Sequence, residues 1–443
     1  MKKILLLLSA FVVLSASANA QHTISGTFTP AEDYTWLIAY RIKPGTQAYS
    51  ADTAIQFGKA TLAMPENAEP GMYRLVYAVP QEEYNFDVIY NGKEDIVFTF
   101  NSDDGATYTN SIENSTLSDY LAEISAVEQD IITFYSKQKT NKKEFNSLLK
   151  SLTSIQKNYE TKSEGLIANH FITANAPYIP EAYSTAEAYV AGKKENYFKA
   201  IDFSNPVLQS SVFLTDKLTN YVFTAVPLTL SGTDELEQEV IKNVDSISTP
   251  LGSLTDDFKF YTYYKLWNTA VAYDYNTVSD YIYTNYLKDL AIATENVEAK
   301  NTIEAHNRLR IGEVAPEITW KTGKELNKLS GLAPAKNYVL IFWSSTCGHC
   351  LKELPALHKE FKNKTDLTVL AVGLEDEVEN WEIEAAKLPN FKHAISLGKW
   401  DSEYAELYDV HATPTYYILD SEKRIIAKPE DDKAAVEFLK KIY

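Results

Sequence analysis

The stretch 342–350 reads FWSSTCGHC and holds the two cysteines of the 443-residue chain, Cys347 and Cys350. An apolar run over 338–343 leads into this stretch, and a helix-like pattern over 347–361 follows the first cysteine. Cys347 is therefore predicted to lie where a buried strand ends and a helix begins. Free backbone N–H groups and the helix dipole stabilise an anion at that position, so we expect Cys347 to form a thiolate easily.

Cys350 follows Cys347 after one helical turn, which is close enough for the two to form a disulfide. We assign nucleophilic attack to Cys347 and resolution of the resulting mixed disulfide to Cys350. His349 lies between the cysteines, and a positive imidazolium there would further stabilise the thiolate and hence the dithiol form. We expect a reduction potential nearer that of protein disulfide isomerase, roughly −180 mV, than that of thioredoxin, roughly −270 mV.

Three other interpretations of the cysteine pair are less favoured. A zinc site needs four ligands, and the sequence has neither a second C-x-x-C motif nor a pair of histidines at zinc-site spacing. A structural disulfide that closes so short a loop would restrain little of the unfolded chain. A peroxidase of the peroxiredoxin kind would have Pro and Thr seven and three residues before its cysteine, where this chain has Leu340 and Ser344.

Strand-like and helix-like segments alternate after the cysteines. They are an apolar run over 367–373, a helix-like stretch over 381–388, strand-like stretches over 415–419 and 424–427, and a closing helix over 433–441. This alternation predicts an α/β domain with a mixed sheet over 306–443. The acidic run 375–384 is interpreted as the solvent-exposed start of a helix.

The stretch 342–350, with Glu353 and Pro355 after it, resembles the active-site segment of the periplasmic TlpA/ResA-like thiol-disulfide oxidoreductases of the thioredoxin-like superfamily. The resemblance covers about 311–443 and includes Gly312, Ala315-Pro316 and the run ATPT at 412–415. It implies a thioredoxin-like fold and exchange of disulfides with protein substrates.

The resemblance also implies roles for individual residues. Pro414 would be the cis-proline that faces the dithiol, the alternative being a trans-proline that opens a strand. The backbone of Thr413 would then pair with an extended substrate segment, and Trp343 is assigned with Thr413 to substrate binding. Glu353 matches an acid that the family uses in proton transfer, and an ordinary solvated helix glutamate is the alternative.

Two positions depart from the wider superfamily. Ile341 occupies the position, six residues before the first cysteine, where thioredoxins have a buried aspartate. Thr346 replaces the tryptophan that often precedes the first cysteine. Proton transfer to and from Cys350 must therefore use Glu353, His349 or water.

The N-terminal residues have the pattern of a cleavable secretory signal over 1–20. Lys2 and Lys3 precede an apolar run over 4–14, and Ala18-Asn19-Ala20 comes just before Gln21. No later run reaches the ~18 apolar residues of a membrane span. We therefore expect export to the periplasm, with no membrane span after signal cleavage.

Two further domains are predicted between the signal and residue 306. Short aromatic and β-branched runs over 21–110 predict a small antiparallel β domain, in which Asn91-Gly92 indicates a type I′ hairpin. Apolar residues recur at helical spacing over 111–305, which predicts a helical domain. The helical pattern is interrupted at Pro177, Pro180, Pro206 and Pro250. The many tyrosines of that region are interpreted as filling between helices.

The net charge argues against nucleic acid as a partner. Asp and Glu number 60 against 42 Lys and Arg, a formal charge of −18 at pH 7. Phosphates attract Lys and Arg, so such a surface disfavours nucleic acids and anionic membranes.

The sequence thus predicts a multidomain fold with a β-rich, a helical and a thioredoxin-like part. Its expected partners are protein or peptide thiols and disulfides, with an inner-membrane electron donor if it works as a reductase. No cofactor or metal is implied, because the dithiol itself carries two electrons. The competing hypothesis is a peptide or glycan binding protein in which the thioredoxin-like domain is a redox tether or scaffold.

Overall fold

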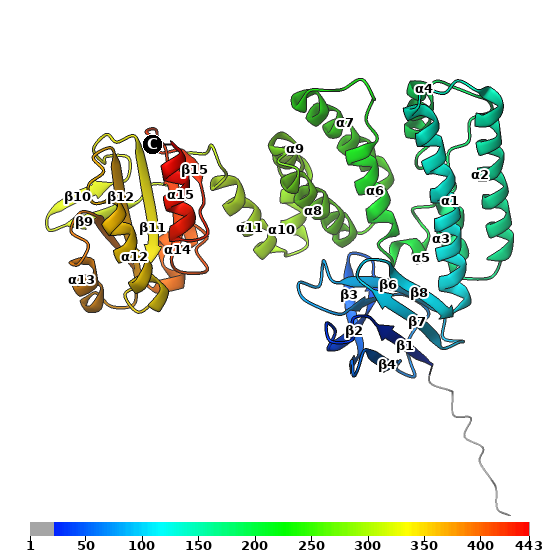
Figure 1. The fold of residues 1–443 in the computed structure, drawn as a ribbon, viewed down its shortest axis with the longest axis horizontal. Helices are drawn as coiled ribbons and strands as arrows, with labels where there is room; N and C mark the ends of the chain where they lie inside the picture. Colours follow the sequence, from blue (N-terminus) through cyan, green and yellow to red (C-terminus); the bar gives the residue numbers. More distant parts are fainter. Residues whose placement is uncertain (1–21, 443) are drawn as a thin grey trace, which may run out of the picture. The chain divides into compact units, whose positions relative to one another are not determined.

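The computed structural model describes residues 22–442, so the predicted signal over 1–20 lies outside the described residues. The chain folds into two compact units, Met1–Thr294 and Glu295–Tyr443 (Figure 1). Within 22–442, none of the helices combines the length and the hydropathy that a membrane span requires.

Two four-stranded sheets make up the β-rich part of the first unit. Their orders are β4-β1-β7-β8 and β3-β2-β5-β6. The strands are β1 (Thr23–Phe28), β2 (Trp36–Lys43), β3 (Thr46–Ala54), β4 (Lys59–Ala63), β5 (Gly71–Val76), β6 (Asn85–Tyr90), β7 (Ile96–Asn101) and β8 (Gly105–Asn110). Alternate residues of each sheet point inward, such as Ile24 and Phe28 of β1 and Leu75 of β5, and they meet in one apolar core. Most pairings are antiparallel as predicted, whereas β1 and β7 run parallel.

The predicted hairpin at Asn91-Gly92 is wrong. β6 pairs with β5 and β7 pairs with β1 and β8, so these two residues join different sheets. Gly92 has a φ of 66°, and the Asn91 side chain accepts a hydrogen bond from the N–H of Lys93 at 2.9 Å. The local turn signal is therefore satisfied without strand pairing, because a tight turn does not determine which strand a segment joins.

Helices fill the rest of the first unit, as the helical spacing predicted. They are α1 (Ile112–Ser136), α2 (Lys142–Lys162), α3 (Ala168–Ala174), α4 (Ala186–Glu195), α5 (Pro206–Gln209), α6 (Phe213–Thr224), α7 (Thr233–Leu251), α8 (Asp256–Ala272), α9 (Asn276–Ile282), the π-helical η1 (Tyr283–Leu287) and α10 (Lys288–Ala293). The buried face of α1 carries Tyr120, Ile124 and Phe134. The side chain of Asn114 bonds the backbone N–H and carbonyl of Ile89, each at 2.8 Å, which ties the start of α1 to β6.

A five-stranded mixed sheet in the order β13-β12-β11-β14-β15 is the centre of the second unit. Its strands are β11 (Asn337–Trp343), β12 (Leu367–Glu375), β13 (Lys392–Leu397), β14 (Thr415–Leu419) and β15 (Ile425–Ala427). β11 runs parallel to β12 and antiparallel to β14. Each face of β11 packs into its own apolar core, and all seven of its residues are buried. The predicted α/β domain with a mixed sheet is confirmed.

Smaller elements surround this sheet. They are α11 (Val297–Arg308), β9 (Thr319–Thr322), β10 (Glu325–Lys328), α12 (Gly348–Phe361), α13 (Glu379–Ala385), the 3-10 helix η2 (Lys399–Asp401), α14 (Glu403–Leu407) and α15 (Asp432–Ile442). α12 and α15 pack on the face of β11 that carries Ile341 and Trp343. The domain boundary expected at 305/306 falls inside α11.

Candidate active site

Cys347 lies at the N-cap of α12, just past the end of β11. Its sulfur accepts a hydrogen bond from the backbone N–H of Cys350 at 3.2 Å. The thiol is partly exposed, whereas Cys350, in the first turn of α12, is completely buried. The predicted position of Cys347 between strand and helix is therefore confirmed.

The two thiols differ strongly in acidity. Burial acts to raise the pKa of Cys347, but hydrogen bonds from the Cys350 thiol and from the backbone N–H groups of Cys350 and His349 outweigh it and lower the pKa. Burial raises the pKa of Cys350 to about 12, and its hydrogen bond with Cys347 adds to this shift. Cys347 is thus the thiol that ionises first, and Cys350 keeps its proton at neutral pH.

A second segment reaches the dithiol at Thr413 and Pro414, immediately before β14. The Thr413–Pro414 peptide bond is cis, as predicted. The Cys347 thiol donates a hydrogen bond to the carbonyl of Thr413 at 3.3 Å. The backbone of Thr413 therefore lies beside the nucleophilic sulfur, which is the arrangement expected for a segment that pairs with a substrate chain.

Glu353 has a partner that the sequence analysis missed. The phenol of Tyr416 on β14 donates a hydrogen bond to the half-buried Glu353 carboxylate at 2.8 Å. Burial, followed by the contact with Glu353, raises the pKa of Tyr416, so the phenol keeps its proton and acts as a donor. Tyr416 pairs in register with Ile341, the position of the missing aspartate, and its place two residues past Pro414 was the available signal.

Glu375 is a second missed residue, and its position corrects the interpretation of the acidic run. It ends β12 with 2% of its surface exposed instead of starting a solvated helix. Its carboxylate accepts hydrogen bonds from the N–H of Ser345 and, at 3.2 Å, from the hydroxyl of Ser344. Both serines belong to the loop that carries Cys347, so the hydrogen bonds to Glu375 fix that loop to the end of β12. A glutamate that ends an apolar run beside a parallel strand was the signal for it.

Three other residues discussed from the sequence contribute no side-chain polar group to the dithiol. The His349 side chain is exposed, and within residues 22–442 no hydrogen bond or ion pair of its imidazole is found. Its backbone N–H contributes to the Cys347 site. Trp343 is 1% exposed and packs in the core beside Cys350, so its indole is not available to a substrate in this structure. Ile341 is completely buried and offers no proton carrier.

Comparison with known proteins gives one family match, which lies in the second unit. Residues 311–428 match the AhpC/TSA family, and no curated protein matches the chain. A solved domain of a possible thiol-disulfide isomerase from Cytophaga hutchinsonii is 31% identical, with 30% of this chain and 93% of that one covered and a TM-score of 0.27. The thioredoxin domain of a thiol-disulfide oxidoreductase from Bacteroides vulgatus is 25% identical over 30% of this chain and 98% of that one, with a TM-score of 0.27. A thioredoxin-like protein from Bacteroides caccae is 20% identical, covers 60% of this chain and 98% of its own length, and has a TM-score of 0.35.

The mixed sheet, the dithiol at the start of α12 and the cis-proline segment define the second unit as a thioredoxin-like thiol-disulfide oxidoreductase. Within that class, residues 311–428 match the model of the AhpC/TSA family. Leu340 and Ser344 still stand where a peroxidase would have Pro and Thr, and Leu340 is completely buried in β11.

Proposed function

We propose that this protein is exported to the periplasm and exchanges disulfides with protein or peptide substrates through the CGHC dithiol. The main support is the contrast between the two thiols. Cys347 is partly exposed with a lowered pKa, while Cys350 is buried with its pKa raised to about 12. This contrast gives attack and resolution to different sulfurs.

The reaction in the reducing direction has two steps. The Cys347 thiolate attacks one sulfur of a substrate disulfide, and the other substrate sulfur leaves as a thiolate that takes up a proton. Cys350 then loses its proton and attacks the Cys347 sulfur, which forms the Cys347–Cys350 disulfide and releases the second substrate thiol. The substrate gains two electrons and two protons, and the enzyme dithiol loses them. An inner-membrane electron donor would regenerate the dithiol.

Other groups of the site assist these steps. The Thr413 backbone, 3.3 Å from the Cys347 sulfur, holds the substrate segment next to the thiolate. Glu353, hydrogen bonded by Tyr416, accepts the Cys350 proton during resolution, directly or through water. Pro414 has no backbone N–H because its nitrogen is part of the ring, so it cannot donate a hydrogen bond to the substrate segment.

Substitution of each cysteine tests the proposal. Cys347→Ser is expected to abolish reduction of insulin disulfides, because it removes the nucleophile. Cys350→Ser is expected to accumulate mixed disulfides, and trapping them in the periplasm with this variant captures substrates and donor together. Both proteins should unfold like the wild type in the reduced state. Unchanged insulin turnover in both variants would contradict the proposed function.

A further inference from the structure

A cavity of about 560 Å³ lies in the first unit, between the β-rich part and the helices. Its walls come from β5 and β6, from α1, α3, α4 and α6, and from the segment 174–178. This volume is in the range of sites for small molecules, which occupy ~300–1,000 Å³. The cavity is separate from the dithiol, which belongs to the second unit.

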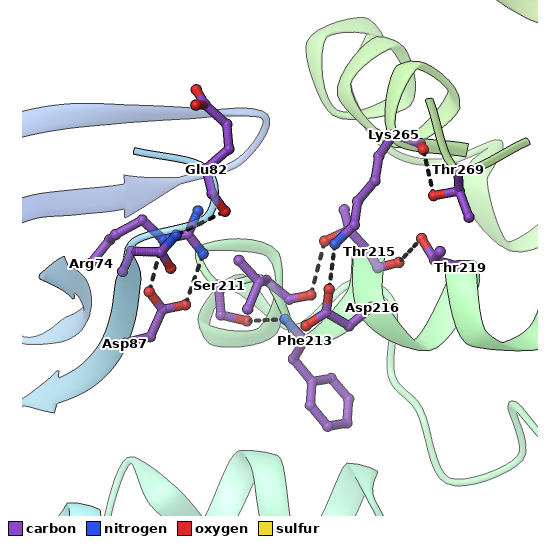
Figure 2. A network of polar contacts seen from close by, with 12 residues as sticks. Arg74, Glu82, Asp87, Ser211, Phe213, Thr215, Asp216, Thr219, Lys265 and Thr269 are labelled. Atoms are coloured by element: carbon purple, nitrogen blue, oxygen red, sulfur yellow. Dashed lines mark hydrogen bonds and ion pairs between the residues drawn. The ribbon is translucent and has the colours of Figure 1, made fainter. Parts of the chain in front are cut away.

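The carboxylates that line the cavity are already paired. Glu128 forms an ion pair with Lys193, with 2.8 Å between the carboxylate oxygen Oε1 and the ammonium nitrogen. Asp87 accepts two hydrogen bonds from Arg74, at 2.9 and 3.1 Å, and Asp216 is paired with Lys265. Figure 2 shows the last two pairs, in which each carboxylate is held by a cation from another element. These acids therefore have no remaining need for a cationic ligand.

Lys217 of α6 is in the opposite situation. It lines the same cavity, but within residues 22–442 its ammonium has no carboxylate at ion-pair distance and no hydrogen bond. The ammonium lies 5.9 Å from the ring centroid of Tyr197 and 5.6 Å from that of Phe213. Burial lowers the pKa of Lys217, and the positive charge of Lys193 adds to the shift against the attraction of Glu128. A partly desolvated cation is thus left without an anion in a cavity with aromatic walls.

We propose that this cavity binds a small organic carboxylate with an aromatic or branched apolar body, and that the carboxylate pairs with Lys217. Phe171, Tyr178, Tyr197 and Phe213 supply apolar surface for the body of the ligand. The amides of Asn175, Asn196 and Asn220 also line the cavity and supply neutral hydrogen-bonding groups for an amide or peptide backbone.

Charge decides between this ligand and two others. A glycan is neutral and would leave the Lys217 ammonium unpaired. A phosphate carries about two charges, but the cavity lining contains no arginine, and Lys193 is already used by Glu128. One carboxylate matches one free ammonium. An N-acylated amino acid and the C-terminal residue of a peptide share this chemistry.

Calorimetric titration of the full chain with matched acids and amides tests the proposal. The probes are N-acetylphenylalanine and the peptide Ala-Ala-Phe, each against its C-terminal carboxamide. At least one acid is expected to bind about ten-fold tighter than its amide, because only the acid forms the ion pair. Binding of the first acid alone indicates a free small acid as ligand, and binding of the peptide alone indicates peptide C-termini. Equal binding of each acid and its amide, or no binding of either acid, would overturn the proposal.

Three variants test whether Lys217 causes the preference for the acid over its amide. Lys217→Met should remove the preference for the acid, and Lys217→Arg should keep most of it. Lys162→Met is the matched control, because Lys162 also lies over a tyrosine ring, 5.0 Å from the centroid of Tyr159, but does not line the cavity. If Lys217→Met kept the full preference for the acid, the proposed contact would be wrong.

A measurement without ligand separates a binding role from a structural one. Lys217→Met should not lower the melting temperature of the free protein, because it removes a cation without an anionic partner and keeps the apolar stem. A fall of more than about 2 °C would show that Lys217 is held for stability and would contradict the proposal. Insulin reduction by this variant should equal that of the wild type, so failure of the cavity proposal leaves the dithiol proposal standing.

Discussion

At the scale of single residues, the chemistry of the site depends on the different surroundings of two cysteine side chains. Cys347 receives hydrogen bonds from the free N–H groups at the start of α12, and Cys350 is buried one turn further in. The same four-residue segment therefore produces one thiol with a lowered pKa and one with a raised pKa.

Alkylation measures this difference directly. The rate at which iodoacetamide alkylates Cys347 should reach half of its maximum below pH ~8.5, the ordinary pKa of cysteine, because the pKa of Cys347 is lowered. Cys350, with a pKa of about 12, should stay unmodified in the native protein up to pH 9. Mass spectrometry of peptides after timed labelling distinguishes the two. Equal labelling of both cysteines at pH 7 would disprove the assigned roles.

Tyr416 is predicted to position Glu353 for proton transfer. Tyr416→Phe removes the hydrogen bond of 2.8 Å that orients the Glu353 carboxylate, so resolution by Cys350 should slow roughly three- to ten-fold. Stopped-flow measurement of mixed-disulfide decay follows this rate.

Tyr417→Phe is the matched control for this variant. Tyr417 is the next residue on β14, faces the other core and donates its hydrogen bond to the backbone carbonyl of Tyr408 at 2.8 Å. Loss of that bond should affect stability without slowing resolution. If both variants slowed resolution equally, Tyr416 would have no specific role.

At the scale of secondary-structure elements, the loop before α12 is held by a side chain from the neighbouring strand. β11 and β12 are parallel and in register from Asn337 and Leu367 onward, so their carboxyl ends lie together. This alignment brings the Glu375 carboxylate under the N–H of Ser345. The geometry of the nucleophile thus depends on β12 as well as on its own strand and helix.

Removal of this carboxylate should loosen the active-site loop. Glu375→Ala leaves the buried N–H of Ser345 without its acceptor, which should lower the free energy of unfolding by about 1–3 kcal/mol. Hydrogen exchange of the amides of 344–347 should become faster, as followed by mass spectrometry. Asp376→Asn is the control, since that neighbouring side chain is 60% exposed and its pair with Lys399 contributes little. An unchanged exchange rate in Glu375→Ala would contradict the supporting role.

At the scale of the whole molecule, each unit depends on a few polar contacts between its layers. In the first unit, the pair of Arg74 on β5 and Asp87 on β6 lies near Ser211 and the start of α6 (Figure 2). Burial raises the pKa of Asp87, and the hydrogen bonds from Arg74 oppose this shift. The carboxylate therefore relies on Arg74 to remain charged at this interface.

Arg74→Met should leave Asp87 as a buried unpaired charge and lower the free energy of unfolding by about 3 kcal/mol at pH 7. The folded state of a carboxyl with a raised pKa binds its proton before the unfolded state does, so the defect should shrink as the pH falls from 7 toward 5. Urea titrations at both pH values test this. The double variant Arg74→Met with Asp87→Leu should recover part of the loss, and a defect that grows at low pH would contradict the account.

Much of the second unit was predictable because its signals are local. Three elements appear at the expected residues: the strand over 415–419, the helix after Cys347 and the closing helix. Each of them has a regular apolar pattern in the sequence. β13 and the hairpin of β9 and β10 were not predicted, because both are short and largely polar on one face. The first unit shows the same limit, since Asn91-Gly92 marks a turn but not the sheet that each flanking strand joins.

The amino-acid sequence by itself determined the dithiol, the strand and helix on either side of it and the class of chemistry that follows. These features depend on residues that are neighbours along the chain. Only the tertiary structure decided that Tyr416 would meet Glu353, that Glu375 would hold the loop of Cys347, and that Lys217 would line a cavity without a carboxylate paired to it. Such contacts join residues far apart in sequence, and a side chain's burial and partners exist only once the packed layers have brought them together.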